Sequence, residues 1–136
     1  RYDDRFAAAV PIAGVGPAID FDAVRMTEMP TWAFHARDDS VVPPVISQTV
    51  VNQILTAADE PTLSFPGLAD PDFEFASGAI DLQYTEWATG GHGIWGTVFR
   101  SEPMYDWMFS RAIPEPRVGI WSGLAFIACW RRKLPR

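Results

Sequence analysis

Short apolar runs that alternate with a stretch of helical periodicity are the feature that most constrains the fold of this chain. Apolar residues fill 5–14 (RFAAAVPIAG) and 30–34 (PTWAF), and apolar and polar residues alternate over 81–89 (DLQYTEWAT). Between the last two runs, residues 43–58 carry apolar side chains at helical spacing. The order strand, helix, strand predicts an α/β fold with helices on both faces of a sheet. We expect its three strands to be parallel and to lie near 7–13, 30–35 and 81–87.

The rest of the chain is punctuated by turn residues. Twelve prolines and ten glycines favour many turns and short helices. Residues 21–29 are expected to form a short irregular or helical connector. The segment 59–80 is rich in Pro, Asp, Phe and Gly, which favours a surface loop or an insertion. One or two helices are expected over 94–112, where Pro103 suits a helix start.

Charge is distributed unevenly along the sequence. Residues 1–116 carry all 17 acidic groups and six of the 11 basic groups, a formal charge of −11, whereas residues 117–136 carry +5. An acidic body argues against nucleic acid as a partner, because phosphate binding needs a basic face. The two histidines and Cys129 are widely separated and do not form a zinc motif. Neither a metal nor a cofactor is therefore expected.

Acidic and histidine side chains follow two of the expected strands. Asp38 and Asp39 come after the strand at 30–34, and His92 comes after the strand at 81–89. Loops at the carboxyl ends of parallel strands meet at one edge of a sheet, where functional groups gather. An aspartate that orients an imidazole is the acid and base half of a nucleophilic triad. The plainer alternative is that the aspartates cap the following helix or hold a turn.

Three segments resemble the α/β-hydrolase esterases, a group that includes polyhydroxybutyrate depolymerase-like, feruloyl esterase-like and phospholipase/carboxylesterase-like enzymes. WAFHARDDSVVP is similar to their His-Gly-x-x-Asp-x-x-Val-Pro segment, and GGHGIW is similar to the loop that bears their catalytic histidine. RYDDRFAAAVPIAG resembles the stretch just beyond their nucleophile helix. The resemblance covers about residues 1–111. It implies a serine hydrolase acting on a small or polymeric carboxylic ester, with Asp39 as the triad acid and His92 as the base.

Four neighbouring residues have weaker assignments. Asp38 is interpreted as a turn residue and His35 as a structural residue near the acid loop. Trp95 and Trp87 are candidates for lining the substrate pocket, and packing against the sheet is an equal alternative for both.

The nucleophile of such a triad has no counterpart in this sequence. A hydrolase elbow needs Gly-x-Ser-x-Gly, because its tight turn admits little bulk beside the serine. Ser77 is flanked by Phe75 and Ala79, and Ser122 by Ile120 and Leu124. We therefore interpret residues 1–112 as the carboxyl-terminal half of an α/β-hydrolase domain, a fragment that is inactive alone. A peptidase of the same superfamily and a non-catalytic binding module on a hydrolase-like fold remain as alternatives.

The last 24 residues form a pattern of their own, IPEPRVGIWSGLAFIACWRRKLPR. Pro114, Glu115 and Pro116 precede an apolar run at 118–130, and a basic cluster follows. This order resembles the PEP-CTERM sorting signal of Gram-negative bacteria, which an exosortase processes. It implies export to the cell envelope or surface, with residues 113–136 as a sorting or anchor segment and 118–130 as a short tail helix that enters the membrane. The alternative is a final amphipathic or buried helix.

Overall fold

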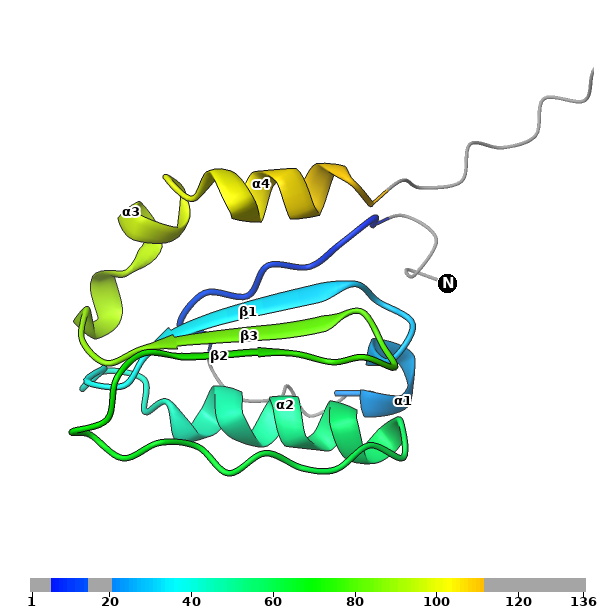
Figure 1. Ribbon diagram of the computed structural model, residues 1–136, viewed down its shortest axis with the longest axis horizontal. Helices are drawn as coiled ribbons and strands as arrows, with labels where there is room; N and C mark the ends of the chain where they lie inside the picture. Colours follow the sequence, from blue (N-terminus) through cyan, green and yellow to red (C-terminus); the bar gives the residue numbers. More distant parts are fainter. Residues whose placement is uncertain (1–5, 15–20, 112–136) are drawn as a thin grey trace, which may run out of the picture.

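The computed structural model describes residues 6–14 and 21–111. Its centre is a three-stranded sheet with the order β1-β3-β2 (Figure 1). The strands are β1 (Thr31–Ala36), β2 (Phe73–Ala76) and β3 (Leu82–Trp87). β1 and β3 pair in parallel, with Thr31 opposite Leu82 and Ala36 opposite Trp87. The predictions of strands near 30–35 and 81–87 are confirmed.

The first predicted strand, at 7–13, is present only as two isolated parallel bridges to β1. Ala9 pairs with Thr31 and Ile12 pairs with Phe34. The N–H of Ala9 donates to Pro30 and that of Ala13 donates to Phe34, both to carbonyl oxygens at 2.8–2.9 Å. Pro11 lies between these two donors and has no N–H, so the ladder is interrupted at its position. The segment therefore follows β1 in the predicted direction without forming a continuous strand.

β2 corrects the prediction that 59–80 is a loop and that the sheet is purely parallel. Phe73 to Ala76 pair antiparallel with β3, opposite Glu86 to Gln83. Only residues 77–81 join β2 to β3, and so short a connection permits only antiparallel neighbours. Phe73 and Phe75 turn toward the sheet's core, whereas Glu74 and Ala76 are exposed. This alternation over FEFA was a strand signal in the sequence.

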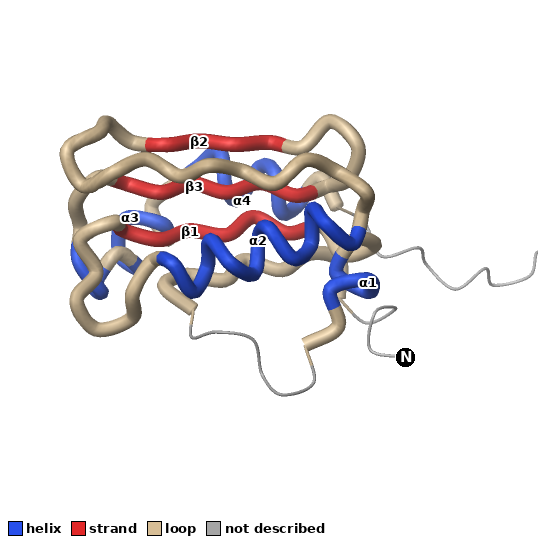
Figure 2. The backbone as a smooth tube through the Cα atoms, turned by 90° about the horizontal axis from the view of Figure 1, so that it is seen from below, coloured by secondary structure: helices blue, strands red, loops and turns tan. Residues whose placement is uncertain are grey.

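Helices cover both faces of the sheet (Figures 1 and 2). On one face lies α2 (Val45–Ala57), with the short α1 (Ala23–Met26) beside it. On the other face lie α3 (Trp95–Val98) and α4 (Glu102–Phe109), which follow the 3₁₀ turn η1 (Gly91–Gly93). Ser101 caps α4 by accepting a hydrogen bond from the Met104 N–H, and Pro103 lies in its first turn, as the sequence predicted.

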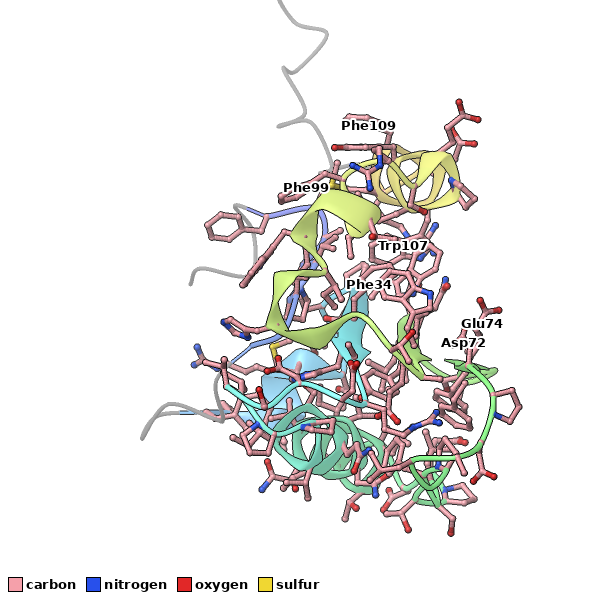
Figure 3. The ribbon with its side chains drawn as sticks, turned by 90° about the vertical axis from the view of Figure 1, so that its left-hand side faces the viewer. Phe34, Asp72, Glu74, Phe99, Trp107 and Phe109 are labelled. Carbon is pink, nitrogen blue, oxygen red and sulfur yellow. The ribbon has the colours of Figure 1, made fainter. Side chains whose placement is uncertain are left out.

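Two apolar clusters hold these layers together. On the α2 face, Leu82 and Tyr84 of β3 pack with Val51, Ile54 and Leu55 of α2. On the opposite face, the cluster consists of Ala13, Phe34, Ala36, Ile94, Val98 and Met104. In Figure 3 Phe34 lies in the interior, whereas Phe99 and Phe109 lie at the periphery. The alternation of β3 residues between the two faces follows the period-2 pattern in the sequence.

The proposed sorting segment lies outside the described residues. Residues 113–136, including Pro114, Glu115, Pro116 and the apolar run at 118–130, are therefore retained as a prediction from sequence. Within 6–14 and 21–111, no helix is long and apolar enough to span a bilayer.

Candidate active site

The candidate site lies where β1 and β3 end at the same edge of the sheet (Figure 1). Because Ala36 is opposite Trp87 in the parallel register, the loops that follow these residues run side by side. The structure brings Asp39 and His92 together from these two loops. Their separation along the sequence is 53 residues, yet their side chains are in hydrogen-bond contact.

Asp39 is a buried carboxylate with a complete set of donors. Its residue is 5% exposed. Oδ1 accepts the backbone N–H groups of Val41 and Val42 at 2.8 and 2.9 Å. Oδ2 accepts from His92 at 2.9 Å. Burial by itself would raise the pKa of Asp39, but the hydrogen bonds from Val42, His92 and Val41 outweigh it and hold this pKa below its ordinary value. The carboxyl is therefore ionised at neutral pH.

His92 presents one ring nitrogen to Asp39 and keeps the other one available. Nδ1 lies 2.9 Å from Asp39 Oδ2, and an ionised carboxylate can only accept, so Nδ1 carries the proton. In a neutral ring Nε2 is then the basic nitrogen. The side chain is 31% exposed, and Trp95 packs against the ring edge-to-face at 4.7 Å between centroids. A general base requires this arrangement of one fixed and one accessible nitrogen.

His35 is a second histidine against the same carboxylate, on its buried side. Its Nε2 lies 2.9 Å from the Val42 carbonyl oxygen and 3.3 Å from Asp39 Oδ2. Both oxygens accept, so Nε2 carries the proton and Nδ1 accepts from the Ser47 hydroxyl at 2.7 Å. The ring is fully buried. The sequence indicated a structural role for His35, and its ring lies beneath the Asp39 carboxylate, on the buried side.

Asp38 lies in the turn that follows β1. Its Oδ1 accepts the Gly91 N–H across the site at 2.7 Å. The backbone N–H groups of the turn bond instead to Asp39 Oδ1. Asp38 is therefore a turn residue, as expected, and its side chain contacts the His92 loop instead of bonding within its own turn.

A buried ion pair behind the site was missed at the sequence level. Arg37 donates from Nε to Glu86 Oε1 at 2.9 Å, and both side chains are almost completely buried. The other guanidinium nitrogens donate to three carbonyl oxygens of the loop that precedes β2, those of Gly67, Asp70 and Pro71. Arg37 thereby ties the segment 67–71 to the end of β1. The only signal in the sequence was a charged residue at the end of each of two apolar strands.

The second oxygen of Glu86 has its own donors. Oε2 accepts from Gln48 of α2 at 2.7 Å and from the Tyr84 hydroxyl at 2.6 Å. Burial and the neighbouring Glu86 carboxylate raise the pKa of Tyr84, so its hydroxyl remains a donor. Every charge in this network is paired, as buried ions require.

The two tryptophans occupy different places. Trp95 is partly exposed beside His92. Trp87 stacks on Phe34 at 5.7 Å in the core below α3 and also borders an open hollow of about 240 Å³ with Asp72, Gly90 and Thr97. A larger, apolar cavity of about 480 Å³ lies on the α2 face, and neither Asp39 nor His92 lines it.

Within the described part of the chain, no hydroxyl or thiol donates a hydrogen bond to His92 Nε2. Ser77 lies in the β2–β3 turn, where its Oγ accepts the N–H groups of Ala79 and Ile80. That turn is at the end of β3 opposite the site. Over 6–14 and 21–111, no group of three or more His, Cys, Asp or Glu side chains is placed to hold a metal ion.

The chain was compared with known proteins at the level of families, sequences and solved structures. No protein-family model and no curated sequence matches the chain. A solved structure described as a thermostable esterase superposes with a TM-score of 0.54 and 25% identity over 78% of this chain. The chain spans 24% of that esterase's length. Together with the mixed sheet and its flanking helices, this likeness defines an esterase-like α/β fold.

Proposed function

We propose that this chain carries the acid and the base of a serine carboxyl-ester hydrolase. The observation that carries the proposal is the hydrogen bond from His92 Nδ1 to the buried carboxylate of Asp39. The likeness to an esterase supports the same class of reaction. An acid and a base on the loops after two parallel strands also follow the order in which α/β-hydrolases present them.

The chemistry assigns a distinct role to each residue. Asp39 stays ionised, fixes the His92 tautomer and stabilises the imidazolium that forms when Nε2 takes a proton. Nε2 would accept that proton from a serine hydroxyl as the oxygen attacks the ester carbonyl carbon, and would later return it to the leaving alkoxide. Trp95, at the edge of the His92 ring, would contact the acyl or alcohol group of the substrate.

The serine would be supplied by a segment outside this sequence, because no Gly-x-Ser-x-Gly occurs in it. The segment 6–14 offers a place for a further strand. The N–H groups of Ala9 and Ala13 point toward β1 and donate to it. Among the described residues, the N–H groups of Val10 and Ile12 have no backbone partner. A neighbouring strand on that side could carry the elbow and its oxyanion donors toward His92.

The test begins with the coding sequence upstream of Arg1 and the longer product it specifies. We expect a Gly-x-Ser-x-Gly motif there, and we expect that product to hydrolyse p-nitrophenyl esters and to react with a fluorophosphonate probe. Residues 1–136 alone should do neither. Cleavage of chromogenic peptides without ester hydrolysis would favour a peptidase, and no reaction at all would favour a binding module. Probe labelling of residues 1–136 would contradict the proposal.

A further inference from the structure

Asp38 and Asp39, at the end of β1, accept hydrogen bonds from two successive residues of the facing loop. Asp39 Oδ2 accepts from the ring of His92, and Asp38 Oδ1 accepts from the backbone N–H of Gly91 at 2.7 Å. Both contacts join residues that are 53 positions apart. One carboxylate therefore holds the imidazole, and its neighbour holds the main chain that carries the imidazole.

We propose that Asp38 is a positioning residue for His92 and acts through the backbone of Gly91 rather than through its charge. The inference rests on the role proposed above for His92 as a general base. Asp38 fixes the position of the main chain that carries His92, and Asp39 fixes the orientation of the imidazole ring. Both must hold for Nε2 to meet a reacting group within hydrogen-bond reach.

The loop needs such an anchor because of its composition. Gly90 and Gly91 have φ angles of +148° and +58°, and two successive glycines lose more backbone entropy on ordering than any other pair. A hydrogen bond from the Gly91 N–H to a side-chain oxygen of the facing turn can offset part of that loss. The start of the same loop is tied in a similar way, because the Ala88 N–H donates to Asp72 Oδ1 at 2.7 Å.

The neighbours of Asp38 already perform the other tasks of this turn. Asp39 Oδ1 bonds the turn's own N–H groups, at Val41 and Val42. Arg37 is committed to Glu86 and to the carbonyl groups of 67–71. The Asp38 side chain is exposed, so it adds little to the core. Among the described residues, the carboxylate of Asp38 accepts its hydrogen bond from Gly91. We therefore assign its effect to the loop that carries His92.

Nuclear magnetic resonance on the ¹⁵N-labelled 136-residue chain tests this role. At about pH 8.5 an ordinary imidazole is neutral, and ¹⁵N shifts distinguish its two tautomers. In the wild type we expect His92 in the Nδ1–H form and a protected Gly91 amide. Asp38→Ala should accelerate hydrogen exchange at Gly91 about tenfold or more and give a mixture of His92 tautomers. Asp38→Asn keeps the acceptor oxygen and should preserve both signals.

Asp106→Ala, on the exposed side of α4, is the matched control and should change neither signal. The proposal is overturned if Asp38→Ala leaves the Gly91 exchange and the His92 tautomer as they are in the wild type. It is also overturned if Asp38→Asn behaves like Asp38→Ala, since the charge would then be the cause. Global unfolding of Asp38→Ala alone would make Asp38 a residue of the fold and would refute the proposal as well. An Nε2–H tautomer in the wild type would instead count against the proposed function.

Discussion

His92 Nδ1 lies 2.9 Å from the Oδ2 atom of Asp39, whose carboxylate also accepts two backbone N–H groups and faces a second, buried histidine. The acid is therefore anchored to its own loop before it contacts the imidazole. A carboxylate anchored in this way cannot follow His92 if the facing loop moves. The relative placement of the two loops consequently decides whether the pair can work.

The first prediction concerns catalysis in a longer product that contains the serine. His92→Ala should lower kcat for p-nitrophenyl ester hydrolysis by about 10⁶-fold, and Asp39→Ala should lower it by about 10⁴-fold. The double variant should be hardly slower than His92→Ala, because residues that act as one unit are not additive. Asp106→Ala serves as the control and should retain full activity. A double variant whose losses multiply would count against a shared mechanism.

The second prediction concerns the buried Arg37–Glu86 pair. Arg37→Met leaves an unpaired buried carboxylate and frees three carbonyl groups of the 67–71 loop, so the free energy of unfolding should fall by about 3–5 kcal/mol. Urea unfolding measures the change. Adding Glu86→Gln should recover part of the loss, because it removes the uncompensated charge. Arg100→Met, at an exposed position, should have almost no effect; equal losses at Arg37 and Arg100 would show that the ion pair does not stabilise the fold.

The third prediction concerns the glycines that shape the His92 loop. Gly90 has a φ of +148°, and a Cβ there would lie 2.6 Å from Ile94 Cγ2. Gly90→Ala should cost about 1–3 kcal/mol of stability and displace His92 from Asp39, which the Nδ1–H signal would report. At Gly93 a Cβ meets nothing within 4 Å, so Gly93→Ala should change stability by less than about 0.5 kcal/mol. Similar effects at the two positions would argue against the loop geometry described above.

The fourth prediction concerns acid stability. The pKa of Asp39 is lower in the folded protein than its ordinary value of 3.8, so as the pH falls the unfolded chain takes up the proton first. The stabilisation that ionised Asp39 provides is complete above about pH 3.8 and is lost as the pH falls through the pKa of Asp39 in the folded protein. Urea unfolding from about pH 5 to about pH 2 should therefore be less pH-dependent for Asp39→Asn than for the wild type. Asp106→Asn, at an exposed position, is the control. If the stability of Asp39→Asn depended on pH as steeply as that of the wild type, the lowered pKa of Asp39 would not be the cause.

The sequence predicted the elements whose periodicity is local. β1, α2 and β3 follow from apolar runs, from 3.6-residue spacing and from period-2 alternation. Asp38, Asp39 and His92 became candidates through their place after two strands, and the choice of Asp39 as the acid came from the resemblance to α/β-hydrolase esterases. The interruption at Pro11 and the strand at 73–76 were missed, although a proline without an N–H and the alternation in FEFA were visible. Neither the Asp38 contact with Gly91 nor the Arg37 network could be predicted, because each depends on which loops become neighbours.

The fifth prediction concerns localisation and depends on the tail alone. We expect a tagged full-length product to be exported to the cell envelope of a Gram-negative host that contains an exosortase, and to be processed near Pro114–Pro116. Replacing Pro114, Glu115 and Pro116 by alanine should abolish the processing while leaving the charge of the basic cluster unchanged. Fractionation and immunoblotting measure both effects. An uncleaved product found only in the cytoplasm would contradict the sorting assignment.

The parallel register of β1 and β3 determines where the chain can change in length. Asp39 is three residues beyond Ala36, and His92 is five residues beyond its partner Trp87. A single residue inserted or deleted between Trp87 and His92 would separate the imidazole from the carboxylate. By contrast, Gly78 lies in the turn at the opposite end of β3, where a Cβ meets nothing within 4 Å. Insertions at Gly78 should leave the pair aligned, so related chains of different length should differ there and keep the short loops beside the site unchanged.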